Sequence, residues 1–417
     1  MKKNLRIKIG LLFSLSVLAV VGFQNCSKSK FSSLSTIGGE NEKVVSATSY
    51  SSSSQLQTST GQADDSQQNF TGKISGTCAL NAQGLPFCWS RGFDQPLVAS
   101  PLELPSGVKG FSTISSDFQV GTCAIDFDGV PYCWGSNYYG TLGIGTDARD
   151  SHMKIPARPN LPQGRYISIS IGGLHACAVE AGGSAYCWGY NYDGQLGNGA
   201  KTDTNAPVRV LASAGVRFVS ISTGGNSTSA LDSNGIAYHW GSETDANPPH
   251  ELGGRYGPSA IPIKVPFPAG VSRYTSLSKN GANTYAMDAS GNIFYWGMSR
   301  KSVYKPCGIT SCLNDIPDKL VLPAGVTKFT NMTAGGSGLY FGATGSDGNT
   351  YFNGSMQRTV FPEGALRMVA YSGNDLSTCA MDSNYSVYCL GPRSDLNPAT
   401  GRVIFSIRTP VKVSNFN

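Results

Sequence analysis

The sequence predicts an all-β fold, a seven-bladed β-propeller assembled from repeats of about 50 residues. Three observations support this prediction: a unit that recurs along the chain, an alternation of apolar and polar residues inside it, and cysteine pairs at one constant spacing. A β-sandwich would not explain so long and regular a period.

The recurring unit reads Cys-Ala-hydrophobic, then a turn with glycine, then aromatic-Cys-Trp-Gly. The tryptophans that close five of the units are Trp89, Trp134, Trp188, Trp240 and Trp296. Two degenerate units follow, at residues 348–354 and 379–391. The successive spacings are 45, 54, 52, 56, 57 and 37 residues, which gives seven units after Phe70.

Strands are predicted inside each unit because apolar and polar residues alternate with a period of two. The segments 165–171 and 216–222 show this pattern clearly. Clusters of Gly, Pro, Asn and Asp separate the strands, and no long apolar helical period occurs after Phe70. We therefore expect blades of short antiparallel strands.

Four of the hairpins are predicted to carry a disulfide bond. A hairpin centred on Asp128 places Cys123 opposite Cys133 and ends its loop at Gly129, where a positive φ is required. Opposed residues lie within disulfide range, and each bridge is worth roughly 2–3 kcal/mol. The same cysteine spacing gives Cys78/Cys88, Cys177/Cys187 and Cys379/Cys389. The equivalent turn glycines are Gly84, Gly183, Gly235, Gly291 and Gly348.

The last unit has Tyr385 at the glycine position, which predicts a different turn there. The fourth unit has Ser229 and His239 at the two cysteine positions, and the fifth has Tyr285 and Tyr295, which are predicted to form a cross-strand aromatic pair. Both cysteines are lost together, as a bridge requires. A further bridge between Cys307 and Cys312 is expected inside an insertion loop. Zinc sites prefer closer cysteine pairs, so we expect no metal and no cofactor.

The N-terminus is predicted to be an export signal, followed by a tether. Residues 1–25 start with basic residues and continue with an apolar stretch too short to span a bilayer comfortably. Cys26 lies where a bacterial lipoprotein signal is cut and acylated, although Asn25 replaces the small residue typical of such signals. Residues 26–70 are rich in Ser, Thr and Gln and predict a flexible lipid-anchored linker.

These features predict a lipoprotein of the bacterial cell envelope. Ser27, directly after Cys26, resembles the sorting signal for the outer membrane, so an outer-membrane lipoprotein is expected, with a simple secreted form as the alternative. The membrane is then contacted through the lipid anchor alone. Residues 71–417 form the propeller. The formal charge of +6 falls to +2 without the four basic residues of the signal, so nucleic-acid binding is not expected.

Residues 175–199 and 123–145 resemble repeats of the regulator-of-chromosome-condensation family, in its exported bacterial lipoprotein form. The resemblance covers residues 71–417 and implies a seven-bladed propeller, often closed by strands from both chain ends. The run 409–413 resembles the strand that ends other units, such as 207–210. The nuclear members exchange nucleotide on a small GTPase, which we do not carry over to a barely basic exported chain. A secreted bacterial class inhibits β-lactamase through one face.

Catalytic residues are not predicted. The four histidines lie in different repeat contexts, and His175 is interpreted as a structural hydrogen-bonding residue. Segments 126–129 and 191–194 lack the full calcium-loop spacing and are interpreted as turns. Trp134 and Trp188 are expected in the core, and the loop 247–250 is expected to be a connector.

Aromatic residues follow the Trp-Gly strand in two neighbouring units and are the candidate ligand contacts: Tyr138, Tyr139, Tyr190 and Tyr192. Packing between blades and contact with a sugar or protein ligand are the two interpretations of these tyrosines, and packing is the more ordinary one. The favoured hypothesis is a monomeric, non-enzymatic binding module that presents propeller-face loops to a protein or glycan. A propeller-type lyase or glycan hydrolase, and a structural scaffold of an envelope assembly, are the alternatives.

Overall fold

The computed structural model describes the propeller region in segments. The residues that it describes are 74–75, 78–88, 99–117, 120–146, 152–242, 259–281, 283–297, 317–334, 341–352, 357–361, 363, 368–373, 378–390, 392–396, 403–407 and 411–412. They belong to the compact unit Val44–Asn417. The predicted signal peptide (1–25), linker (26–70), lipidated Cys26, the Cys307/Cys312 bridge and the loop 247–250 all lie outside them.

The described strands form seven four-stranded antiparallel sheets and one two-stranded hairpin. We number the four-stranded sheets as blades 1 to 7 in chain order.
Blade 1 contains β1 (Ile74–Ser75), β2 (Cys78–Leu80), β3 (Pro86–Cys88) and β4 (Ser100–Pro101).
Blade 2 contains β5 (Phe111–Asp117), β6 (Gly121–Asp126), β7 (Pro131–Ser136) and β8 (His152–Ala157), with the short 3-10 helix η1 (Tyr138–Gly140) after β7.
Blade 3 contains β9 (Tyr166–Gly172), β10 (His175–Glu180), β11 (Ala185–Gly189) and β12 (Thr204–Arg209).
Blade 4 contains β13 (Phe218–Gly224), β14 (Ser227–Asp232), β15 (Ala237–Gly241) and β16 (Ser259–Lys264).
Blade 5 contains β17 (Tyr274–Asn280), β18 (Asn283–Asp288), β19 (Ile293–Gly297) and β20 (Asp318–Lys319).
Blade 6 contains β21 (Phe329–Ala334), β22 (Phe341–Gly345), β23 (Thr350–Phe352) and β24 (Gln357–Thr359).
Blade 7 contains β25 (Met368–Gly373), β26 (Thr378–Asp382), β27 (Val387–Leu390) and β30 (Val411–Lys412).

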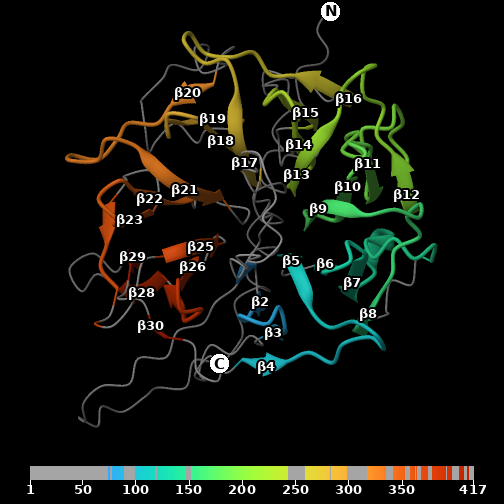
Figure 1. Cartoon of the computed structure of the whole chain (residues 1–417), viewed down its shortest axis with the longest axis horizontal. Helices are drawn as coiled ribbons and strands as arrows, with labels where there is room; N and C mark the ends of the chain where they lie inside the picture. The colour runs from blue at the N-terminus through green and yellow to red at the C-terminus, as the bar shows by residue number, and fades with distance from the viewer. Residues whose placement is uncertain are drawn as a thin grey trace, which may run out of the picture. The chain divides into compact units, whose positions relative to one another are not determined.

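The blades are arranged as a propeller, which confirms the predicted fold class. Figure 1 shows the first strands, such as β5, β9 and β13, nearest the centre and the fourth strands, such as β8, β12 and β16, at the periphery. The first strand of each blade contacts the first strand of the next, and β1 contacts β25, so the ring closes. Blade 1 is the least developed, because its strands have only two or three residues.

The C-terminal run completes blade 7, as its resemblance to the strand ending other units predicted. Val411 in β30 pairs with Cys389 in β27, just as Val208 in β12 pairs with Cys187 in β11. The separate hairpin of β28 (Pro392–Leu396) and β29 (Val403–Ile407) lies between β27 and β30 in the chain. It therefore occupies the position of the loop that joins the third and fourth strands in the other blades.

The predicted cysteine pairs are disulfide bonds in blades 1, 2, 3 and 7. They join Cys78 to Cys88, Cys123 to Cys133, Cys177 to Cys187, and Cys379 to Cys389, with Cα atoms 4.0–4.1 Å apart. Blade 5 has Tyr285 opposite Tyr295, with ring centroids 6.2 Å apart, which confirms the predicted aromatic pair.

Blade 4 has Ser229 opposite His239, and the serine Oγ lies 3.2 Å from the imidazole Nδ1. A polar pair thus stands where the other hairpins have a covalent bond.

The prediction of a different turn at Tyr385 is wrong. Tyr385 has a φ of 62°, in the left-handed region that the glycines occupy in the other hairpins. Its N–H donates to the Asp382 carbonyl, as the Gly129 N–H donates to the Asp126 carbonyl in blade 2. Asp382 Oδ1 accepts hydrogen bonds from Asn384 N and Ser386 N, which fixes the turn despite the side chain at position 385.

The hydrophobic core lies between neighbouring blades. Phe218, Ile221 and Trp240 of blade 4 pack against the Cys177–Cys187 face of blade 3. Trp134 and Trp188 are buried, as predicted. The turn glycine of one blade also accepts a backbone hydrogen bond from the next: Gly183 O accepts from Phe218 N at 2.9 Å. A Cβ at Gly183 would lie 2.8 Å from Arg217 Cα, so the joint between the blades requires glycine.

Serine residues join the first strands of neighbouring blades. Ser115 Oγ accepts from Ile171 N at 3.1 Å, and Ser170 Oγ accepts from Thr223 N at 3.0 Å. Ser222 Oγ repeats the contact with Lys279 N at 3.0 Å. All three serines are fully buried. They satisfy backbone N–H groups that face the neighbouring blade and would otherwise be left without an acceptor.

Among the described residues, no helix is long and apolar enough to cross a membrane.

Candidate functional site

The four candidate tyrosines come from two equivalent loops in blades 2 and 3. Each loop follows the third strand of its blade, β7 or β11, and leads to the fourth strand, β8 or β12. In both loops an asparagine is followed by an exposed tyrosine, Tyr138 after Asn137 and Tyr192 after Asn191. Equivalent repeat positions therefore place aromatic side chains at the same end of two adjacent blades.

The structure brings the four tyrosines together in one continuous row, which we call the tyrosine surface. The ring centroids are 4.4 Å apart for Tyr138 and Tyr139, and 5.0 Å apart for Tyr139 and Tyr190. Tyr190 and Tyr192 are 6.5 Å apart, with ring planes inclined by only 16°. Tyr138 is 37% exposed and Tyr192 is 54% exposed, so both ends of the row face solvent.

The loop of blade 2 is held by a buried asparagine and by the tryptophan of blade 3. Asn137 Oδ1 accepts from Leu142 N at 3.0 Å, and Asn137 Nδ2 donates to Thr146 O at 2.8 Å. Trp188 Nε1 donates to Thr141 O at 2.8 Å. A Cβ at Gly143 would lie 2.8 Å from Trp188 Nε1, so the glycine permits this close approach. The backbone that carries Tyr138 and Tyr139 is thereby fixed to the next blade.

The loop of blade 3 is built in the same way. Asn191 Oδ1 accepts from Leu196 N at 3.0 Å, and its Nδ2 donates to Ala200 O and Thr202 O, both at 3.0 Å.

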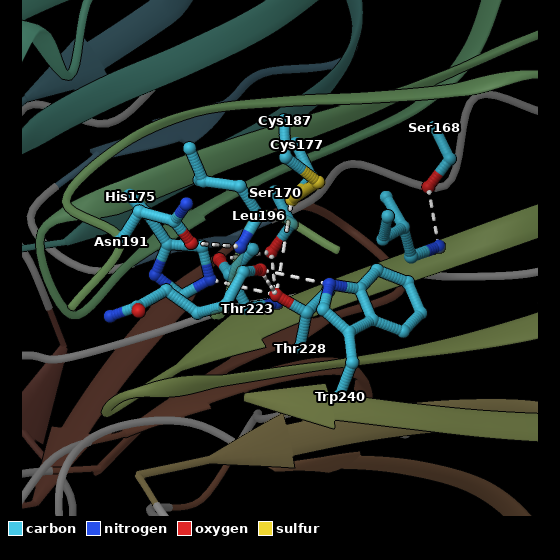
Figure 2. The surroundings of a disulfide bond; sticks show 12 residues. Ser168, Ser170, His175, Cys177, Cys187, Asn191, Leu196, Thr223, Thr228 and Trp240 are labelled. Carbon is cyan, nitrogen blue, oxygen red and sulfur yellow. Dashed lines mark hydrogen bonds between the residues drawn. A yellow bond between two sulfur atoms is a disulfide. The ribbon is translucent and has the colours of Figure 1, made fainter. Parts of the chain in front are cut away.

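The loop of blade 3 is fixed to blade 4 at one carbonyl. Gln195 O accepts from Trp240 Nε1 and from Thr228 Oγ1, each at 2.8 Å. Figure 2 shows Asn191 and Leu196 beside Thr228 and Trp240, next to the disulfide bond of blade 3. Both ends of the tyrosine surface therefore rest on rigid backbone, which reduces the entropy lost on binding.

Two residues of this region have strained backbone. Tyr139 has a φ of 58° and Leu174 a φ of 82°, and both are in the left-handed region that disfavours L side chains. Leu174 O accepts a hydrogen bond from Tyr190 N at 3.0 Å, so Leu174 holds the backbone of one tyrosine of the row. Such strain persists only where the surroundings impose it, and it is concentrated at functional sites.

The blade 3 end of the tyrosine surface carries carboxylates. Burial, and then the nearby charge of Asp193, raise the pKa of the Tyr190 phenol; Asp203 adds to this effect. Burial also raises the pKa of Asp193, while a hydrogen bond from Asn226 and the charge of Lys201 oppose that rise. Asp203 is exposed, and its Oδ1 accepts from Asn191 N at 2.8 Å.

The histidines that the structure buries are structural. His175 Nε2 lies 2.8 Å from Thr228 Oγ1, a contact that joins blades 3 and 4 and is visible in Figure 2. Burial, followed by the charge of Lys279, lowers the pKa of His175 to about 3. The same two causes lower the pKa of His239 well below its usual value. Both rings are inaccessible to solvent, which supports the structural interpretation of His175.

The segments that superficially suggest calcium loops are turns. Asp126 Oδ1 accepts hydrogen bonds from Asp128 N and Val130 N, at 2.9 and 2.8 Å, and so closes its hairpin. The Asn191 side chain makes its hydrogen bonds to backbone groups of its own loop. The described residues contain no group of three His, Cys, Asp or Glu side chains placed to hold a metal ion.

Sequence reasoning identified the tyrosines but missed the residues that position them. Asn137 and Asn191 are both fully buried and organise the two loops. The repeated Asn-x-x-Gly-x-Leu-Gly pattern, at residues 137–143 and 191–197, was the available signal. Leu174 and Asp203 had no such signal, because they join the site only through the folded chain.

The fold and site define a class: a disulfide-containing β-propeller with an aromatic surface on adjacent blades. Two models of the "Regulator of chromosome condensation (RCC1) repeat" match the chain, one at residues 128–179 and 182–231 and the other at 166–195. These segments include both tyrosine-bearing loops. The chain carries repeats of the RCC1 family.

Curated relatives match parts of the chain. It is 30% identical over 168 residues to the mitochondrial RCC1 domain-containing protein RUG3 of Arabidopsis thaliana, covering 38% of this chain and 36% of RUG3. It is 32% identical over 167 residues to the ultraviolet-B receptor UVR8 of the same plant, covering 40% and 36%. The human regulator of chromosome condensation is 24% identical over 294 residues, covering 62% and 66%. The matches span less than two thirds of each relative.

Solved structures share the fold. Yeast RCC1 (Prp20), solved with Kap60 bound to it, has a TM-score of 0.61 at 14% identity, covering 87% of this chain and 91% of that chain. Prp20p from Saccharomyces cerevisiae, whose binding to Gsp1p and histones was studied, has a TM-score of 0.58 at 17% identity, covering 81% and 87%. At these identities the likeness concerns the fold alone.

Proposed function

We propose that this protein is a non-enzymatic binding module that recognises a protein partner through the tyrosine surface. The observation that carries this proposal is the uninterrupted row of four tyrosines on two loops fixed to neighbouring blades. Rigid tyrosines offer a large contact area at a small entropic cost, and they are enriched at the energetic centres of interfaces. Fold relatives that bind Kap60, Gsp1p or histones provide precedents for protein binding by such a propeller.

We further propose that the module is anchored to the bacterial outer membrane through an acylated Cys26, with residues 26–70 as its tether. The basic and apolar residues before Cys26 and the four disulfides both support export, because disulfides form in oxidising compartments. The intact mass of the natively expressed chain tests this part. A chain that starts at Cys26 with added acyl mass supports it, and an unmodified Met1 contradicts it.

Site-specific photocrosslinking in cells tests the binding proposal. A photoreactive phenylalanine analogue replaces Tyr192 in one variant and Asp128 in a matched control. Asp128 is exposed in the hairpin turn at the opposite end of the blade 2 strands. We expect a discrete protein adduct from position 192 and none from position 128.

Equal adducts from both positions, or none from position 192, would contradict the proposed surface. An adduct at position 192 that contains sugar and no protein would assign the same surface to a glycan.

A further inference from the structure

We infer that the blade 3 end of the tyrosine surface is a recognition site for an arginine side chain of the partner, with the guanidinium stacked on Tyr192 and paired with Asp203. This inference rests on the proposed function and specifies the chemistry of the partner. Its three components are an open aromatic face, a carboxylate fixed to the same loop, and a local excess of negative charge.

The aromatic component is Tyr192. Its side chain is 54% exposed, and its ring is nearly parallel to that of Tyr190, at 16°. A planar cation held between two parallel rings would need ring planes about 7 Å apart, twice a normal contact distance. The two centroids are only 6.5 Å apart, so the outer face of Tyr192 is the available stacking surface. Guanidinium groups stack on tyrosine faces more readily than ammonium groups do.

The anionic component is Asp203. Its Oδ1 is engaged by Asn191 N at 2.8 Å, which fixes the carboxylate next to the tyrosine loop. Its Oδ2 has no hydrogen bond within the described part of the chain, and the residue is exposed. A fixed carboxylate with one available oxygen can accept an N–H of a guanidinium that lies over Tyr192.

The local charge favours a cation over a neutral sugar. Among the described residues, the charged groups that shift the pKa values of Tyr190 and Asp193 are Asp193, Asp203 and Lys201, and their formal sum is −1. Without the four basic residues of the predicted signal, the chain is net positive, at +2 overall. A cationic side chain therefore gains electrostatic attraction here that a neutral sugar does not.

Fluorescence anisotropy with labelled hexapeptides tests the inference. The probes are hexaarginine, hexalysine and hexacitrulline, at one fixed salt concentration, with a neutral glucan hexasaccharide as the glycan probe. We expect hexaarginine to bind more tightly than hexalysine, and hexacitrulline to show no binding. Tyr192→Ala and Asp203→Asn should each weaken hexaarginine binding about two- to fivefold, as expected for exposed cation–π and ion pairs.

Two matched variants complete the design. Tyr192→Phe keeps the aromatic face and should retain the affinity, and Asp128→Asn removes the same charge at the opposite end of a blade and should leave it unchanged. Equal affinities for hexaarginine and hexalysine, or equal losses in Asp203→Asn and Asp128→Asn, would overturn the arginine site. So would binding of the glucan alone. A crosslinked partner at position 192 would then still support the proposed function.

Discussion

The buried asparagines Asn137 and Asn191 determine whether the tyrosine surface exists as a surface. Each makes side-chain hydrogen bonds to backbone groups of its own loop, and that loop carries two of the four tyrosines. The tyrosines themselves contribute little to this scaffold, because Tyr138 and Tyr192 are partly exposed. In each loop the asparagine therefore positions the backbone, and the tyrosines provide the exposed surface.

Replacing Asn191 with alanine should loosen the blade 3 loop and cost about 2 kcal/mol of unfolding free energy. The variant leaves Leu196 N, Ala200 O and Thr202 O without their partner, and buried groups without a partner are costly. Urea unfolding measures the loss, and hydrogen exchange of residues 191–203 locates it. Thr202→Ala, an exposed change in the same loop, is the control; an equal effect in both variants would contradict this role for Asn191.

At the scale of the element, the hairpin between the second and third strands is the unit that the sequence predicts best. The cysteine spacing and the turn glycine determined the register of six hairpins, and the structure has that register. The Tyr385 turn could not be predicted, because Asp382 holds it in a conformation that tyrosine disfavours. The alternation of apolar and polar residues showed that serines recur in the first strands. Only the folded structure shows that their Oγ atoms accept backbone N–H groups from the first strand of the next blade.

The hairpin of blade 4 should accept the disulfide that it lacks. In the Ser229→Cys/His239→Cys double variant, the two cysteines face each other in the register of the four natural bridges. We expect the oxidised chain to be lighter by two hydrogen atoms and to unfold at a higher temperature than the reduced chain, since the bridge is worth roughly 2–3 kcal/mol. Each single cysteine variant is a control. Free thiols in the folded double variant would refute the proposed equivalence of the hairpins.

The whole molecule depends on joints between blades, and two buried histidines lie in this part of it: His175 in the joint between blades 3 and 4, and His239 in the hairpin of blade 4. His175 and His239 have folded-state pKa values below the unfolded value, so the unfolded chain binds protons that the folded chain excludes. The stabilisation is complete above about pH 6.5 and is lost as the pH falls toward 3. The nearby Lys279 charge acts in the same direction at both rings.

Unfolding free energy should therefore decrease by about 1 kcal/mol per histidine between pH 7 and pH 5.5. Urea unfolding at several pH values measures this slope. The His239→Gln variant keeps a polar partner for Ser229 and should show about half of the histidine contribution. A slope unchanged by that substitution would mean that His239 titrates normally in the folded protein.

The central claim at this scale is that the tyrosine surface serves recognition and not packing between blades. The most direct test is the Tyr138→Ala/Tyr192→Ala double variant, assayed in parallel for its unfolding temperature and for the partner adduct formed by a photoreactive group at Tyr190. Recognition predicts an unfolding temperature close to that of the wild type, because the two replaced rings are partly exposed, together with loss of the adduct. A strongly lowered unfolding temperature with the adduct retained would show that the tyrosines join the blades and would contradict the claim.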